Sequence, residues 1–123
     1  MRDFKALKVW QSSQDLTVQI YKITQTFPRD EQFGVTSQIR RASVSISSNI
    51  AEGCGRVSQA EFARFLEIAF GSACEVESLL LLCRRLGYLP EEQLKFVVPP
   101  TDELKRSLNS FIQKVKREST PSQ

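Results

Sequence analysis

The sequence contains no histidine. Histidine is the commonest metal ligand and the usual base beside a serine or cysteine nucleophile, so its absence argues against ordinary zinc sites and hydrolase triads. General acid–base work by carboxylates or lysines would need strongly shifted pKa values in a pocket, and no pattern in the chain marks such a pocket. We therefore expect that this protein is not an enzyme and holds neither a metal nor another cofactor.

Cysteine is scarce, and long apolar runs are missing. Cys54, Cys74 and Cys83 are odd in number and widely spaced, unlike a disulfide framework or a zinc-binding pair. The longest uncharged apolar run covers only residues 79–83, whereas a membrane-spanning helix needs about 20 apolar residues. Residues 1–5 contain no apolar signal core. The expectation is a cytoplasmic protein with reduced cysteines and no membrane contact.

What is present is the composition of one folded domain. Hydrophobic residues make up 41% and charged residues 25% of the 123 positions, near the averages for folded soluble proteins. We assign residues 1–118 to a single domain and residues 119–123 to a disordered tail. The formal net charge of +3 is mild, and residues 58–90 carry a slight acidic excess, so the basic excess lies outside that segment.

Apolar residues recur at helical spacing, and no stretch alternates apolar and polar residues for long enough to make a strand. This pattern predicts an all-α bundle of about four helices, near residues 7–26, 36–53, 58–86 and 101–118. Each helix has an apolar stripe that should face the core. The stripes are Val9, Leu16, Ile20, Ile23 and Phe27; Ile39, Ala42, Ile46, Ile50 and Gly53; Phe62, Leu66, Ala69, Ala73, Val76, Leu80, Cys83 and Gly87; and Leu104, Leu108, Phe111, Ile112 and Val115.

The helix boundaries follow from capping and breaking residues. Phe27-Pro28 ends the first helix, and Ser58 with Glu61 fits a capping box that opens the third. Gly87 is the expected carboxyl cap of the third helix. Pro99-Pro100 should not lie inside a helix, so we expect the last segment to be broken there and the last helix to begin near Thr101.

The second expected helix is rich in serine, although serine hydroxyls compete with the helix for backbone groups. Arg41, Ser45, Ser48 and Glu52 are spaced by four, three and four residues, so they fall on one polar stripe beside the apolar one. This polar stripe either packs against another helix or subunit, with the serines permitting close approach, or it simply faces water.

Asn49 and Glu52 could also meet Glu67 or Glu75 of the third helix in a small polar site. A carboxylate cluster suggests metal or acid chemistry, but di-metal bundles use Glu-x-x-His pairs, which the chain lacks. A structural hydrogen-bond network is the favoured interpretation. The residues expected to serve such a polar interface are Arg41, Ser45, Ser48, Asn49, Glu52 and Glu75.

Basic residues offer a candidate phosphate-binding surface, especially if an oligomer repeats a modest patch around a ring. The candidates are Arg40, Arg56, Lys105, Arg106, Lys114, Lys116 and Arg117. A solvated face is the simpler interpretation for one copy, because the small net charge gives weak steering and no aromatic-rich nucleic-acid motif accompanies these residues.

Several of these segments together resemble one protein family. They are Leu7-Lys8-Val9-Trp10-Gln11, Phe27-Pro28, Ser37-Gln38-Ile39-Arg40-Arg41-Ala42, Ser45-Ile46, Ser48-Asn49-Ile50-Ala51-Glu52-Gly53, Arg56 and Leu86-Gly87-Tyr88-Leu89. The chain resembles, from about Phe4 to Val115, the four-helix bundle family encoded in intervening sequences of bacterial 23S ribosomal RNA genes. The block from Arg40 to Gly53 is the most specific part of the resemblance.

The resemblance implies an antiparallel, up-down-up-down four-helix bundle that assembles into a ring-like homopentamer. It also implies similarity to the accessory variability protein of diversity-generating retroelements, which binds nucleic acid and partners a reverse transcriptase. The expected break at Pro99-Pro100 departs from the more continuous final helix of the family. We therefore expect a non-enzymatic, oligomeric accessory protein that binds RNA or DNA; the alternative is a protein-interaction scaffold without nucleic-acid binding.

Overall fold

The computed structural model describes residues 2–119, and four long helices make up most of this span. They are α1 (Lys8–Thr24), α2 (Val35–Cys54), α3 (Gln59–Arg85) and α5 (Val98–Ser119). Short helical pieces flank them, namely η1 (Phe4–Ala6), η2 (Arg29–Glu31) and α4 (Glu91–Leu94). Residues 2–119 contain no strand, so the all-α prediction is confirmed.

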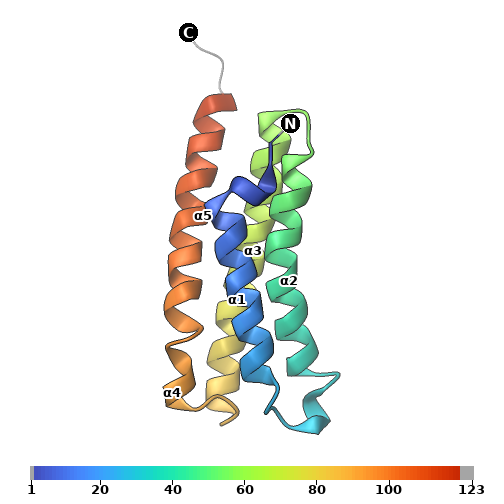
Figure 1. Cartoon of the computed structure of the whole chain (residues 1–123), viewed down its shortest axis with the longest axis vertical. Coiled ribbons are helices and arrows are strands. Elements are labelled where there is room, and N and C mark those ends of the chain that lie inside the picture. The colour runs from blue at the N-terminus through green and yellow to red at the C-terminus, as the bar shows by residue number, and fades with distance from the viewer. Residues whose placement is uncertain (1, 120–123) are drawn as a thin grey trace.

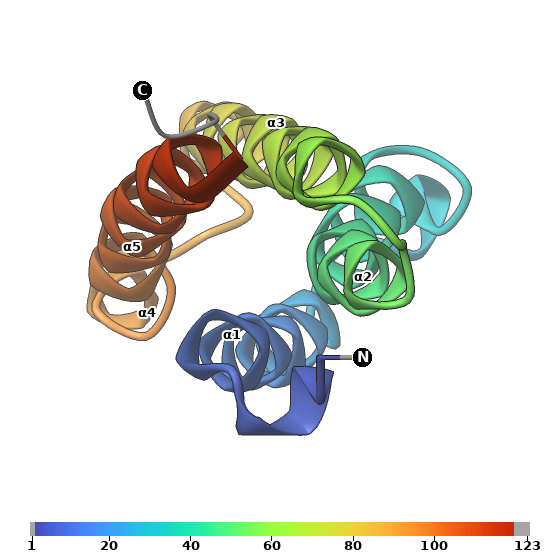
Figure 2. The ribbon, with the colours of Figure 1, turned by 90° about the horizontal axis from the view of Figure 1, so that it is seen from above.

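The four long helices are antiparallel and form a bundle. Figure 1 shows α1 and α3 running in one direction and α2 and α5 in the other, and Figure 2 shows the order α1, α2, α3, α5 around the core. Each long helix therefore lies beside its neighbours in the chain, as an up-down-up-down bundle requires. No helix within residues 2–119 is long and apolar enough to cross a lipid bilayer. The tail expected at 119–123 lies outside the described residues, except for Ser119, the last residue of α5.

The four expected apolar stripes form the core. All their residues are buried except Phe111, which is half-buried against the core, and Gly87, which is exposed. Ala69 and Ala73 of α3 are completely buried, and their small side chains let the neighbouring helices approach α3 closely. Burying a large aliphatic side chain contributes about 1.5–3 kcal/mol, so these stripes are the main source of stability.

The serine-rich part of α2 packs against α1. Ser13 of α1 and Ser43 of α2 are both completely buried, and each donates its hydroxyl to a carbonyl of its own helix, at 2.8 and 2.9 Å. Thr17 of α1 also donates to the carbonyl oxygen of Ser43, at 3.1 Å. These small side chains satisfy their own hydroxyls, which explains how a helix rich in serine can be buried on that side.

The caps of α3 are as expected at both ends. The backbone N–H of Glu61 donates to the Ser58 hydroxyl at 3.1 Å. The Glu61 carboxylate accepts from the same hydroxyl, whereas in a full capping box it would accept from the backbone N–H of Ser58. At the other end, Gly87 has φ +80°, and the N–H of Tyr88 donates to the carbonyl of Cys83 at 3.0 Å. This six-to-one bond with a left-handed glycine is the Schellman arrangement, which residues with a Cβ disfavour.

The expectation that the last helix begins at Thr101, after a break at Pro99-Pro100, is corrected by the structure. Helix α5 begins at Val98, so both prolines lie in its first turn, and the interruption falls at residues 95–97. The first N–H groups of a helix have no partner within it, so proline there loses no hydrogen bond. The N–H of Thr101 donates to the carbonyl of Val97 at 3.1 Å, and α5 is continuous through both prolines.

Gly53 lies at a close contact between α2 and α3. A Cβ added at position 53 would lie 2.8 Å from the Cβ of Phe65 and 3.2 Å from Cδ1 of Phe62. A Cβ added at Gly71, in the exposed middle of α3, would meet nothing within 4 Å. Packing therefore requires glycine at position 53, whereas position 71 has room for a larger side chain.

We predict opposite effects of alanine at these two glycines. Gly71→Ala should raise the free energy of unfolding by about 0.5–1 kcal/mol, because it removes backbone freedom from an exposed helix interior. Gly53→Ala should lower it by about 1 kcal/mol or more, because overpacking at about 1–3 kcal/mol exceeds the gain in helix propensity. Urea denaturation of the two variants gives both values. Stabilisation by Gly53→Ala would contradict the close helix contact.

Candidate nucleic-acid interface

Helix α5 has an outer side that is basic. Residues 104–117 contain five basic residues and no acidic one. These five are Lys105, Arg106, Lys114, Lys116 and Arg117, all of them predicted phosphate-binding candidates. Because the apolar stripe of α5 faces the core, the basic residues point outwards, and all except the half-buried Lys105 are exposed.

Two of the five basic residues are bound to α3. Lys105 Nζ lies 2.6 Å from Oε1 of Glu77, and Lys116 Nζ lies 2.7 Å from Oε2 of Glu67. The hydrogen bond with Glu77 is the main cause that raises the pKa of Lys105. These salt bridges join α5 to α3. The half-buried Lys105 is the more committed of the two lysines, because the Lys116–Glu67 pair is exposed and solvent-screened.

The other three basic residues of α5 have no salt bridge or side-chain hydrogen bond within residues 2–119. We call Arg106, Lys114 and Arg117 the α5 basic face. At about 100° and 1.5 Å per residue, Arg106 and Arg117 point in directions about 20° apart and are separated by about 16 Å along the helix axis. Ser110 and Gln113 are exposed between them. Such a row of unpaired cations with polar neighbours suits contacts to successive phosphates.

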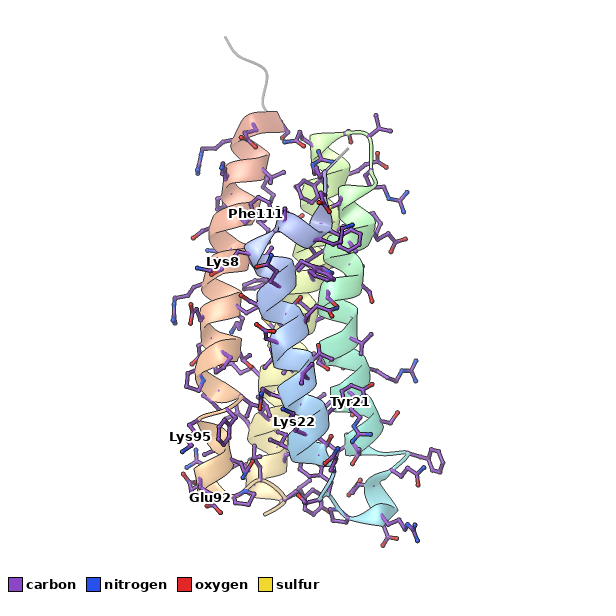
Figure 3. All side chains as sticks on the ribbon, viewed as in Figure 1. Lys8, Tyr21, Lys22, Glu92, Lys95 and Phe111 are labelled. Atoms are coloured by element: carbon purple, nitrogen blue, oxygen red, sulfur yellow. The ribbon has the colours of Figure 1, made fainter. Side chains whose placement is uncertain are left out.

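Arg40 does not join this face. Its Nε donates to the hydroxyl of Thr24 at 2.8 Å, and its guanidinium carbon lies 4.6 Å from the ring centroid of Tyr21. Figure 3 shows Tyr21 on α1, in the half of the bundle away from the carboxyl end of α5. Arg40 therefore ties α2 to α1, and this structural use explains its position.

Arg56 is also engaged, at the turn between α2 and α3. Its guanidinium lies 3.3 Å from Oε1 of Glu52 and stacks over the ring of Phe65, with 4.6 Å between guanidinium carbon and ring centroid. The pair with Glu52 is exposed and solvent-screened, so it leaves Arg56 partly accessible to other anions. Arg56 is a weaker phosphate candidate than the α5 basic face.

Arg2 is a basic residue that the sequence analysis missed. Its guanidinium carbon lies 4.1 Å from the ring centroid of Phe62, and the group donates to the Arg56 carbonyl at 3.1 Å and to the Gln59 side chain. Gln59 in turn donates to a carboxylate oxygen of Glu118 at 3.4 Å. Arg2 and Arg56 therefore lie at the bundle end where α5 terminates, the upper end in Figure 1. No local sequence signal precedes Arg2 that could have indicated this stacking.

The polar stripe of α2 divides into two parts. The Ser45 hydroxyl lies 2.9 Å from the hydroxyl of Ser72 on α3, and the Asn49 amide donates to the Ser45 hydroxyl at 3.0 Å. This network lies between α2 and α3 of the same chain. Arg41, Ser48 and Glu52 are exposed, as is Glu75 on α3. The small Ser45 side chain therefore serves packing between two helices of the same chain. The exposed residues Arg41, Ser48, Glu52 and Glu75 stay candidates for a contact with another chain.

The polar site expected from Asn49, Glu52 and Glu67 or Glu75 does not form. Asn49 is bonded to Ser45, Glu52 pairs with Arg56, and Glu67 pairs with Lys116. Within the described part of the chain, no three cysteine, aspartate or glutamate side chains gather as a metal-binding group. Two of the three carboxylates are held elsewhere, since Glu52 pairs with Arg56 and Glu67 pairs with Lys116 on α5.

Comparisons with known proteins identify a family and a related solved structure. A family model described as 23S rRNA-intervening sequence protein matches residues 5–110. A solved crystal structure from Bacteroides thetaiotaomicron VPI-5482, a protein with unknown function from the S23 ribosomal protein family, is 32% identical with a TM-score of 0.75. That match covers 85% of this chain and 97% of the other chain. No curated protein matches the sequence.

We predict that Arg40 and its neighbour Arg41 differ sharply in their effect on stability. Arg40→Ala should lower the free energy of unfolding by about 1–2 kcal/mol, because it removes a charged hydrogen bond and a cation–π contact. Arg41→Ala removes the same charge from an exposed side chain, and its effect should stay within about 0.5 kcal/mol. Urea denaturation at one salt concentration compares the pair. Equal effects would refute the structural role of Arg40.

Proposed function

The chain belongs to the 23S rRNA-intervening sequence protein family, and from its surface chemistry we propose that it is an oligomeric, nucleic-acid-binding accessory protein of the cytoplasm. It acts by holding RNA or DNA and not by catalysis. Support for binding comes from charges that the fold leaves unused, and support for a non-catalytic role comes from a sequence without histidine.

The observation that carries the proposal is the α5 basic face. Most other basic groups near it are already paired, whereas Arg106, Lys114 and Arg117 have no acidic partner within residues 2–119. An unpaired guanidinium donates to a phosphate without first breaking an internal salt bridge. Contacts of this kind depend on backbone phosphates, so binding should show little preference for base sequence.

One copy presents only three such charges, which is few for strong binding. A homo-oligomer repeats the face on every protomer, and a long nucleic acid that meets several faces gains affinity from their linkage. We propose a homopentamer, as the family resemblance implies. The mild net charge of the single chain is consistent with a protein that relies on repetition of a local patch.

The first experiment is a salt titration of RNA binding with a matched charge control. Substituting Arg106, Lys114 and Arg117 together with alanine should weaken binding at low ionic strength and reduce the slope of log K against log salt by about 2–3, since about one counterion is released per phosphate contact. The control variant carries alanine at Lys8, Lys22 and Arg85, which are exposed and form no salt bridge within residues 2–119. It has the same net charge, and we expect its slope to match the wild type.

Fluorescence anisotropy with a structured RNA and a single-stranded DNA of equal length provides the measurement. If wild-type protein binds neither at low salt, the proposed function is wrong. If both triple variants lose binding equally, net charge alone is responsible and the α5 basic face is not the site.

A second candidate function is a protein-interaction scaffold, with a partner such as a reverse transcriptase. The observation that favours it is a group of exposed apolar side chains near the carboxyl end of α3, including Leu81, Leu82 and Leu86. Apolar contacts persist in high salt, whereas phosphate contacts do not. A partner retained from the native host in high salt after nuclease treatment would favour the scaffold over nucleic-acid binding.

A further inference from the structure

Phe33 is an exposed aromatic residue without a partner in its own chain. It lies in the segment from Arg29 to Gly34, which contains η2 and leads into α2, and 91% of its surface is exposed. Single exposed apolar residues are common, but a phenylalanine carries 150–250 Å² of surface that is normally buried. No packing within residues 2–119 explains why phenylalanine occupies this position.

An apolar groove lies at the same end of the bundle, between α3, α4 and α5. Its lining includes Leu80, Leu81, Leu94, Val98 and Pro99, and its volume is about 290 Å³. A cavity of about 150 Å³ is enough to hold a benzene ring. The groove is partly open, because Leu81 is 56% and Val98 is 36% exposed. It therefore has both the size and the chemistry to accept a phenyl side chain.

The groove and the Arg29–Gly34 segment face away from each other. In Figures 1 and 2 the segment projects beyond α2 on one side of the bundle, while α4 lies on the opposite side at the same end. Phe33 cannot reach the groove of its own chain across the bundle. When a second copy lies beside the first with its helices in the same direction, the groove of the second copy and Phe33 of the first lie at the same level along the helix axes (Figures 1 and 2).

We propose that Phe33 of one protomer inserts into the α3–α4–α5 groove of the next copy of this chain. The two surfaces are different and lie on opposite sides, so the contact is head-to-tail, and repetition around an axis parallel to the helices closes a ring. This contact rests on the proposed oligomeric function and supplies its interface. It uses residues separate from the α5 basic face.

Charges around the two surfaces are complementary. The Phe33 segment carries Arg29 and Asp30, and the groove is bordered by Lys95 and Asp102. None of these four forms a salt bridge within residues 2–119. Lys95 lies on the side of the bundle away from α2, as Figure 3 shows. Docking therefore allows Asp30 to pair with Lys95 and Arg29 to pair with Asp102, which favours a second copy as the occupant of the groove.

The test is the solution mass of the full chain, measured by light scattering and sedimentation over a range of concentrations. Wild-type protein should form oligomers, and Phe33→Ser should shift the mass toward the 14.0 kDa of a single chain. The matched control is Val57→Ser, which changes a residue that is 98% exposed at the opposite end of the bundle, and its mass should equal the wild type. Both substituted side chains are exposed in the single chain, so both variants should keep the helical content of the wild type.

A charge exchange tests the proposed pairing. Asp30→Lys and Lys95→Asp should each lower the oligomeric mass, and the double variant should restore it, because the exchanged charges attract again. A monomeric wild-type chain, an unchanged mass for Phe33→Ser, or no recovery in the double variant would overturn the contact. Loss of RNA binding by Phe33→Ser without a fall in mass would also overturn it, since Phe33 would then meet the nucleic acid. Failure of the α5 basic face is a separate result, because its triple variant should keep the wild-type mass.

Discussion

The close packing of α2 against α3 at Gly53 is the constraint on which the surface of this protein depends. Gly53 leaves room there for the side chains of Phe62 and Phe65. Along the same interface Ser45 comes opposite Ser72, and Arg56, just after α2, lies over Phe65. A bulkier residue at the crossing would shift α2 along or away from α3. Small residues in the core thus set the helix register, and the register decides which polar groups form hydrogen bonds within the protomer.

The basic residues divide between structural and available charges. Arg40 holds α1 to α2, and Lys105 and Lys116 hold α5 to α3, so their charges stabilise the arrangement of helices. Arg106, Lys114 and Arg117 on the outer side of α5 take no part in this, since they form no salt bridge within residues 2–119. Only a small set of basic residues therefore remains to bind an external anion. Their combined affinity for a long nucleic acid grows only when several copies of the chain are joined.

The proposed functions occupy separate parts of the bundle. The proposed phosphate contacts lie along the outer side of α5, whereas the apolar groove and Phe33 lie at the end formed by α4 and the turn before α2. Pro99, in the first turn of α5, and Leu81 of α3 both line the groove, and Leu81 is left partly uncovered there. A ring built through that end leaves the α5 basic face of each copy independent of the contact.

The sequence alone was sufficient for the four helices, their buried stripes and the caps at Ser58 and Gly87, since helical period and capping act over three to seven residues. It misplaced the start of α5, because proline is unfavourable inside a helix but harmless in its first turn. Tertiary structure alone decided which charges are paired. Arg40 meets a residue 16 positions away and Arg2 one 57 positions away, and only the packing of the helices brings such distant groups together.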